Sequence, residues 1–219
     1  MQKILIISIL FCLIGSSPIH AQKTANEATI QYIISKLSNS SGNSNKGVQQ
    51  GTMTIYVKGD LCKAELQNNL GTEISFYDAK KKEGVILKEY SGQKLMIQLT
   101  EQNWNQHNQL FHNLSFTFDG TNKQINQVVC KKATATTSDG QTIIAYVSVE
   151  KDITNKDYPI AFPKLIGIPY EIKKNIANVV FQYELQNINF ESVPSNTFEI
   201  PKTGYRVISY DEAMKIKNH

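Results

Sequence analysis

The stretch from Gly51 to Thr100, GTMTIYVKGDLCKAELQNNLGTEISFYDAKKKEGVILKEYSGQKLMIQLT, decides the fold. It divides into five short strand-like segments: GTMTIYV (51–57), LCKAELQ (61–67), TEISFYD (72–78), GVILKEY (84–90) and QKLMIQL (93–99). Between them lie KGD, NNLG, AKKKE and SG, whose glycines, Asn/Asp residues and lysines favour tight turns. The stretch therefore predicts a meander of antiparallel strands.

In several of these segments the residues of one parity are apolar, as in Met53, Ile55 and Val57. Side chains alternate between the two faces of a strand, so these sets fall on one face of the sheet. The chain has few helices to cover a face of this width, so the sheet must fold over on itself as a barrel, half-barrel or sandwich. The predicted fold class is mainly β: a curled antiparallel sheet, or half-barrel, with a short C-terminal helix.

Residues 1–21 read as a targeting segment. Lys3 supplies the positive start, ILIISILFCLIG the apolar run, and SSPIHA a small-residue exit that ends at Ala21. The apolar run is too short for a membrane span, so we expect a cleaved secretory signal. The remainder, residues 22–219, is predicted to be a single antiparallel β domain that is exported to the periplasm or outer-membrane periphery, or secreted.

Outside the meander, the pattern of apolar residues predicts further elements. Residues 28–37 fit either a helix or a strand, and their β-branched content favours a strand. Residues 100–112 break the alternation and suggest a helical turn or a capping loop. We expect further strands at 113–119, 128–137, 141–150 and 178–188, a polar turn at 120–127, an extended edge that ends at Pro201, and a helix at 209–217 in which Ser209 and Glu212 match a capping box.

The segment 158–170 contains three prolines among many apolar residues, which excludes a regular helix or a central strand. It is predicted to be either a lid over an apolar cavity, with Phe162 and Ile166 at its centre, or a plug that completes the core. The apolar faces predict the cavity lining itself: Ile97, Phe116, Phe118, Phe181, Tyr183 and Leu185.

Charge and composition argue against several classes of partner. Loss of Lys3 lowers the formal charge from +4 to +3, and Arg206 is the only arginine in the chain. Because phosphate and guanine recognition relies on arginine forks, nucleic acid is not expected as a partner. No second long apolar run follows the signal, so no transmembrane span is expected after its removal.

The sequence contains few residues that indicate a disulfide, a metal site or a catalytic site. Cys62 and Cys130 remain after signal removal, and an even count in an oxidising compartment permits one disulfide between them. Two thiols without a histidine at matching spacing predict no metal site, and no cofactor is expected. The sequence contains no nucleophile elbow, P-loop, zinc-protease motif or redox pair, so we expect no enzyme.

Five segments carry a resemblance to known proteins: YVKGDLCKAEL (56–66), FYDAKKKEGVILKEYSGQKLMIQLTEQNW (76–104), VVCKKATATTSDGQTIIAYVS (128–148), FPKLIGIPYEI (162–172) and FEIPKTGYRVISYDE (198–212). They resemble an uncharacterised family, a domain of unknown function, of exported proteins from Gram-negative bacteria. The resemblance implies no activity and no catalytic residue. The chain departs from the family at Cys62, where a polar residue is expected.

The architecture is also distantly similar to the LolA-like lipoprotein carrier fold, in which a curved antiparallel sheet wraps an apolar cavity that shields acyl chains. The first helix and the arginine at the cavity mouth of such carriers are not evident here. Together these features predict an exported envelope protein that binds or carries an apolar or amphipathic ligand such as a lipid. The alternative is a structural or protein-interaction module of the envelope with a filled core.

Overall fold

The computed structural model describes residues 23–37, 48–176 and 179–217. The expected signal segment, residues 1–21, lies outside this part of the chain. Within the described part, no helix combines the length and apolarity needed to cross a membrane. The strands are β1 (Lys23–Ala25), β2 (Glu27–Leu37), β3 (Val48–Lys58), β4 (Leu61–Asn68), β5 (Gly71–Asp78), β6 (Glu83–Tyr90), β7 (Gln93–Thr100), β8 (Thr117–Ile125), β9 (Val128–Thr136), β10 (Thr142–Ser148), β11 (Lys151–Ile153), β12 (Ile168–Ile176), β13 (Val179–Asn189) and β14 (Arg206–Ser209). The helices are α1 (Glu101–His112), the 3-10 turn η1 (Ser195–Phe198) and α2 (Tyr210–Lys217).

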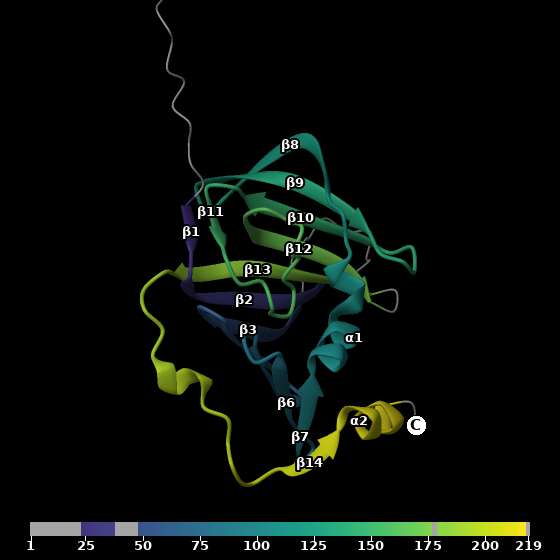
Figure 1. The fold of residues 1–219 in the computed structure, drawn as a ribbon. Coiled ribbons are helices and arrows are strands. Elements are labelled where there is room, and N and C mark those ends of the chain that lie inside the picture. Colours follow the sequence, from purple (N-terminus) through teal and green to yellow (C-terminus); the bar gives the residue numbers. More distant parts are fainter. Residues whose placement is uncertain (1–22, 38–47, 177–178, 218–219) are drawn as a thin grey trace, which may run out of the picture.

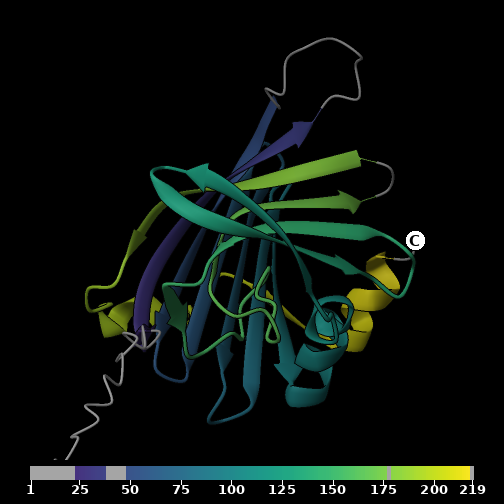
Figure 2. The same cartoon turned by 90° about the horizontal axis from the view of Figure 1, so that it is seen from above.

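Twelve strands form one open sheet in the order β14-β7-β6-β5-β4-β3-β2-β13-β12-β10-β9-β8. All neighbouring pairs are antiparallel except β14 and β7, which are parallel. The sheet is strongly curled, and α1 and the loop after β11 lie on its concave side (Figures 1 and 2). The predicted class is therefore confirmed: a mainly β protein with a curled sheet and a short C-terminal helix. The parallel edge pair makes the sheet mixed.

The five-strand meander is confirmed, since β3 to β7 pair in chain order. Residues 27–37 form a strand, as the β-branched content favoured, and 101–112 form a helix. The run Lys80–Lys82 lies in the β5–β6 turn, where Asp78 accepts hydrogen bonds from the backbone N–H groups of Lys80 and Lys81. The turn is exposed to solvent.

Two expectations about strand boundaries were wrong. The strand expected at 113–119 begins at Thr117 and continues to Ile125, through the segment that was expected to be a polar turn. The turn itself needs only Asn126 and Gln127, which both have positive φ, a pattern that suits a two-residue hairpin turn. A register shift between Phe118 and Asn122 lets β8 bend along its partner.

The proline-rich segment also contains a central strand, which was not expected. β12 lies between β10 and β13, and Pro169 pairs with Val147 where the register of β10 shifts. A bulge is a position that tolerates the missing N–H of proline. The preceding Gly167 has φ +99°, and a Cβ there would lie 2.2 Å from the carbonyl oxygen of Ser148, so only glycine fits this close approach.

The C-terminal segment was predicted as an extended edge that ends at Pro201. Instead, residues 190–205 run as a strap along the outer face of the sheet, with η1 in its middle, and the edge strand β14 follows the proline (Figure 1). The strap covers a small apolar cluster on that face, formed by Phe76, Leu87 and Met96 with Tyr205 packed against it.

The predicted disulfide is absent: Cys62 and Cys130 are both free and buried. Cys62 lies on β4 and Cys130 on β9, and five strands separate β4 from β9 in the sheet order. Strand spacing of about 4.8 Å makes the separation along the sheet several times the reach of a disulfide. The alternation of side chains shows which face of the sheet a cysteine is on. It does not show how far apart two strands lie in the sheet, so the sequence could not exclude the disulfide.

Candidate functional site

The loop between β11 and β12, residues 154–167, fills most of the concave side. Ile160, Phe162 and Leu165 are buried in the main core, the apolar cluster that β2, β3, β4, β9, β10, β12 and β13 build. Phe162 meets the rings of Phe111 and Phe116 edge-on, with centroids 6.1 and 5.0 Å apart. The pocket between the loop, Tyr32 and Pro169 measures about 10 Å³. The geometry therefore favours the plug over the lid.

The residues that were predicted to line one cavity therefore lie in three different places: the main core, the surface and a second apolar cluster. Phe116, Phe181, Tyr183 and Leu185 belong to, or pack against, the main core that the loop fills. Phe118 is 47% exposed on β8, and Ile166 is 57% exposed on the loop surface. Ile97 belongs to a second apolar cluster, which lies under the two helices.

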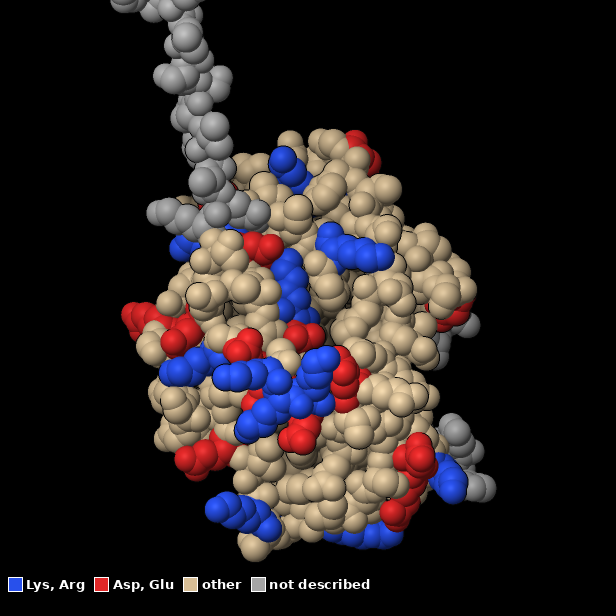
Figure 3. Space-filling view, viewed as in Figure 1, with Lys and Arg blue, Asp and Glu red and all other residues tan. Residues whose placement is uncertain are grey.

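Ile97 lines an open groove of about 530 Å³ between α1 and α2. Its floor is formed by β6, β7 and β14, and the two helices lie side by side at this end of the sheet (Figures 1 and 2). Over α1 the surface carries few charged side chains (Figure 3). The lining comprises Ile86, Lys88, Leu95, Ile97, Gln106, His107, Gln109, Leu110, Ile208, Tyr210, Ala213, Met214 and Ile216.

Helix α1 is held in place at its first turn and by one aromatic side chain. Thr100 caps the helix, accepting a hydrogen bond from the N–H of Asn103, whose side chain in turn accepts one from the N–H of Thr100. Trp104 is 1% exposed and stacks on Tyr77 with ring centroids 4.5 Å apart and planes 10° from parallel. Gly84 lies beneath the indole, where a Cβ would come within 3.3 Å of the ring. The helix is thus seated firmly on β5 and β6.

Helix α2 forms the other wall and is fixed by its own N-terminus. The Ser209 hydroxyl accepts a hydrogen bond from the N–H of Glu212, which confirms half of the expected capping box. The Glu212 carboxylate instead forms an ion pair with Arg206 at 2.6 Å. Tyr210 is buried and meets His107 edge-on across the groove, with centroids 6.5 Å apart. Burial, aided by Asp211, raises the pKa of Tyr210, so its phenol stays neutral.

A larger cavity, about 870 Å³, lies between the strap and strands β4 to β7. Its apolar lining includes Leu61, Phe76, Leu99, Phe198 and Ile200. It carries more charged residues than the groove, since six of its lining residues are acidic or basic: Asp78, Lys81, Lys82, Glu83, Glu101 and Glu199. By contrast, Lys88 is the one charged residue that lines the groove. The groove is therefore the better match for an apolar chain.

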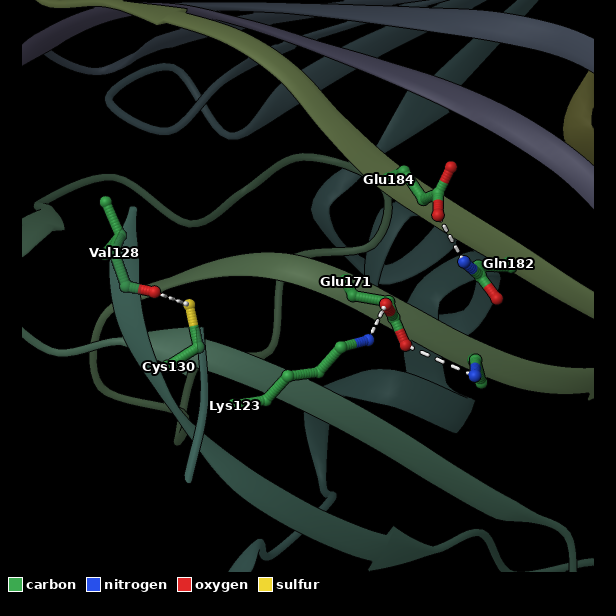
Figure 4. A network of polar contacts seen from close by, with 7 residues as sticks. Lys123, Val128, Cys130, Glu171, Gln182 and Glu184 are labelled. Atoms are coloured by element: carbon green, nitrogen blue, oxygen red, sulfur yellow. Dashed lines mark hydrogen bonds and ion pairs between the residues drawn. The ribbon is translucent and has the colours of Figure 1, made fainter. Parts of the chain in front are cut away.

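Another group of ionisable side chains forms a polar network on β8, β9, β12 and β13 (Figure 4). Glu171 is 4% exposed and pairs with Lys123 at 2.6 Å and Lys173 at 3.3 Å. Nearby, the Cys130 thiol donates to the Val128 carbonyl, and burial raises its pKa to about 11. A thiol held in its neutral form is a poor nucleophile. Across the described ranges, no group of three or more His, Cys, Asp or Glu side chains is arranged to hold a metal ion.

Sequence patterns gave little sign of the groove. Leu110, Met214 and Ile216 lie on two short helices, so no strand alternation marks them. One feature of the sequence could have indicated the groove: the predicted C-terminal helix carries the apolar residues Met214 and Ile216, and the sequence does not show what they pack against.

No protein-family model matches the chain, and no curated protein matches it. Among solved structures it is similar to PNGF-II in a C2 crystal form, with a TM-score of 0.53 and 12% identity over 89% of this chain and 32% of that chain. It is also similar to an uncharacterised conserved protein from Thermus thermophilus, with a TM-score of 0.52 and 9% identity over 83% of this chain and 90% of that chain. The chain spans about a third of the length of PNGF-II. At such identities the likeness shows the fold alone.

The Mycobacterium tuberculosis lipoprotein LppX also matches, at a TM-score of 0.38 and 8% identity over 76% of this chain and 88% of that chain, which is too low to carry a functional argument. The absence of a matching family model and of a matching curated protein is consistent with the expected resemblance to an uncharacterised family.

Proposed function

We propose that this chain is an exported, non-catalytic protein that binds or carries an apolar or amphipathic ligand, such as a lipid or acyl chain. The ligand would lie in the groove between α1 and α2, at the periplasmic or outer-membrane periphery or outside the cell. The observation that carries the proposal is the groove itself. Its 530 Å³ falls within the range of about 300–1,000 Å³ that is usual for ligand sites, and nine of its thirteen lining residues are apolar or aromatic.

Burial energetics indicate the size of ligand that such a groove can hold. Each buried methylene contributes about 0.8 kcal/mol, and micromolar affinity requires about 8 kcal/mol. Because association also has an entropic cost, chains shorter than about ten methylenes cannot reach micromolar affinity by burial alone. A single long acyl chain is therefore the smallest apolar ligand that suits the groove.

The test is saturable uptake of a fluorescent fatty acid or lysolipid by residues 22–219. The groove variant is Leu110→Gln with Ile216→Gln, which changes two exposed lining residues without adding charge. Its matched control is Leu70→Gln with Val48→Gln, two exposed apolar residues outside the groove. We expect at least tenfold weaker binding by the groove variant and unchanged binding by the control.

A second candidate is a structural or protein-interaction module of the envelope. The filled concave side favours it, because the predicted internal cavity is occupied by the protein's own loop. If the wild-type protein shows no saturable uptake, the carrier proposal fails and the interaction module takes its place. If both double variants bind alike, the groove is not the binding site.

A further inference from the structure

The groove has one closed end and one open end along β6. Gly84, Ile86 and Lys88 share a face of this strand because side chains two residues apart lie on the same side. Trp104 is buried and packs over Gly84, and because neither residue lines the groove, the groove ends between Gly84 and Ile86. Ile86 lies in the middle of the floor, and Lys88 follows about 7 Å further along, beside Leu95 of β7. An acyl chain that enters with its tail first would therefore leave its headgroup beside Lys88.

The open end of the groove carries a single charged side chain. Lys88 is the one charged side chain lining the groove, and its ammonium group lies 2.9 Å from Glu73, directly across from it on β5. Both side chains are partly exposed, at 35% and 26%, and such pairs are weak. An ammonium group has three donors, so Lys88 can hold Glu73 and still bind a ligand oxygen. Its alkyl stem remains against the apolar floor.

We infer that the groove selects amphiphiles with an anionic headgroup, a carboxylate or a phosphate, and that Lys88 is the residue that recognises it. This inference rests on the proposed function and specifies its ligand class. Glu73 limits the preference, because it competes with the ligand for the same ammonium group and repels the incoming anion.

The neighbouring strands provide a matched pair of residues for comparison. Glu89 of β6 and Lys94 of β7 also lie directly opposite each other, with 3.1 Å between their charged groups. They belong to the outer face, where Lys94 lies over the ring of Tyr205, and they do not line the groove. The substitution Lys94→Gln therefore removes the same charge and the same type of ion pair without changing the groove.

The experiment measures displacement of a neutral solvatochromic probe by three twelve-carbon ligands: dodecanoate, dodecanol and dodecyltrimethylammonium. The wild-type protein should prefer dodecanoate to dodecanol by about tenfold and bind the cationic ligand most weakly. Lys88→Gln should abolish the preference while leaving dodecanol binding unchanged, whereas Lys94→Gln should retain it. Glu73→Gln should strengthen dodecanoate binding severalfold, an increase that a merely structural ion pair would not produce. Dodecyl phosphate in place of dodecanoate separates the two anionic headgroups.

Two results would overturn the inference: equal binding of dodecanoate and dodecanol by the wild-type protein, or an unchanged preference in Lys88→Gln. Either can occur while dodecanol still binds in the groove, in which case the proposed function stands. If no ligand displaces the probe and the probe itself does not bind, the proposed function fails with it. Circular dichroism of each variant checks that the sheet is intact.

Discussion

Lys123 on β8 and Glu171 on β12 form an ion pair of 2.6 Å, although β9 and β10 lie between their strands in the sheet (Figure 4). The long lysine side chain reaches across both strands and lies over the ring of Tyr146 on β10, 4.9 Å from its centroid. The contact ties the bent edge hairpin, β8 and β9, to the middle of the sheet. Glu171 is buried, and Lys123 and Lys173 are its ion-pair partners.

This arrangement predicts that Lys123→Met lowers the free energy of unfolding by about 1–3 kcal/mol, as measured by urea denaturation. The loss stays below that of a fully broken buried pair because Lys173 still lies 3.3 Å from Glu171. Lys131→Met, an exposed lysine on the same hairpin, is the control and should change stability by less than about 0.5 kcal/mol. Equal effects of the two substitutions would show that the ion pair has no stabilising role.

The two cysteines give a second prediction. In unreduced, denatured residues 22–219, thiol titration should find two free thiols, and in the native protein neither should react rapidly. Burial raises the pKa of Cys62 and of Cys130, and both side chains are nearly inaccessible. A denatured sample that titrates fewer than two thiols without reductant would mean that a disulfide forms after all.

Much of the fold was predictable because strand alternation and turn residues act locally. The segments between Gly51 and Thr100 carry both signals, and the structure places each strand within a few residues of its predicted position. What failed depended on contacts between distant parts of the chain. Pro169 fits a central strand only because β10 shifts its register there, and Cys62 and Cys130 are kept apart only by the strand order.

The site was less predictable for a related reason. The sequence shows that an apolar face exists but not which residues cover it. Phe162 and Leu165 pack into the concave side of the sheet. Most of the residues that were predicted to line a ligand cavity are therefore part of the hydrophobic core. Ile97 is 4% exposed but still lines the groove, because α1 and α2 cover its part of the sheet incompletely. The two helices come together only through the parallel pairing of β14 with β7, which no local pattern indicates.

The ends of the strap should respond to acid. Glu27 accepts hydrogen bonds from the Val193 N–H and the Ser192 hydroxyl, which lower its pKa below 4.5. Glu89 accepts one from the Tyr205 hydroxyl, which likewise lowers its pKa. Because both pKa values are depressed in the folded state, these contacts stabilise the strap above the ordinary pKa of 4.5 and are lost as the pH falls through the folded values.

We therefore expect protease cleavage within residues 192–205 to accelerate below pH 4.5 before the sheet unfolds. Glu27→Gln should give faster cleavage already at neutral pH and a weaker pH dependence. Glu199→Gln changes an exposed carboxylate in the same strap and serves as the control. Cleavage that follows global unfolding, seen as loss of the β-sheet circular dichroism signal, would argue against local release.

The substitution Gly84→Ala tests the packing of α1 on the sheet. The added methyl carbon would lie 3.1 Å from the Phe76 carbonyl oxygen and 3.3 Å from the Trp104 ring, so the indole must shift. We expect a loss of about 1–3 kcal/mol in stability and a change in the fluorescence of the only tryptophan. If the fluorescence and the stability both stay unchanged, the packing of Trp104 on Gly84 does not fix the helix.

The last prediction concerns ligand length and separates the groove from the main core as the binding site. Within a series of straight-chain ligands, affinity should rise about fourfold per methylene, since each contributes about 0.8 kcal/mol. The rise should stop once the chain reaches the end of the groove beyond Ile86, where Trp104 packs over Gly84. Ile166→Asp, in the loop over the main core, should leave every affinity in the series unchanged, since Ile166 is 57% exposed and lies outside the groove. If Ile166→Asp weakens binding while Leu110→Gln with Ile216→Gln does not, the ligand enters beneath the loop, which would then act as a lid, and the groove is not the site.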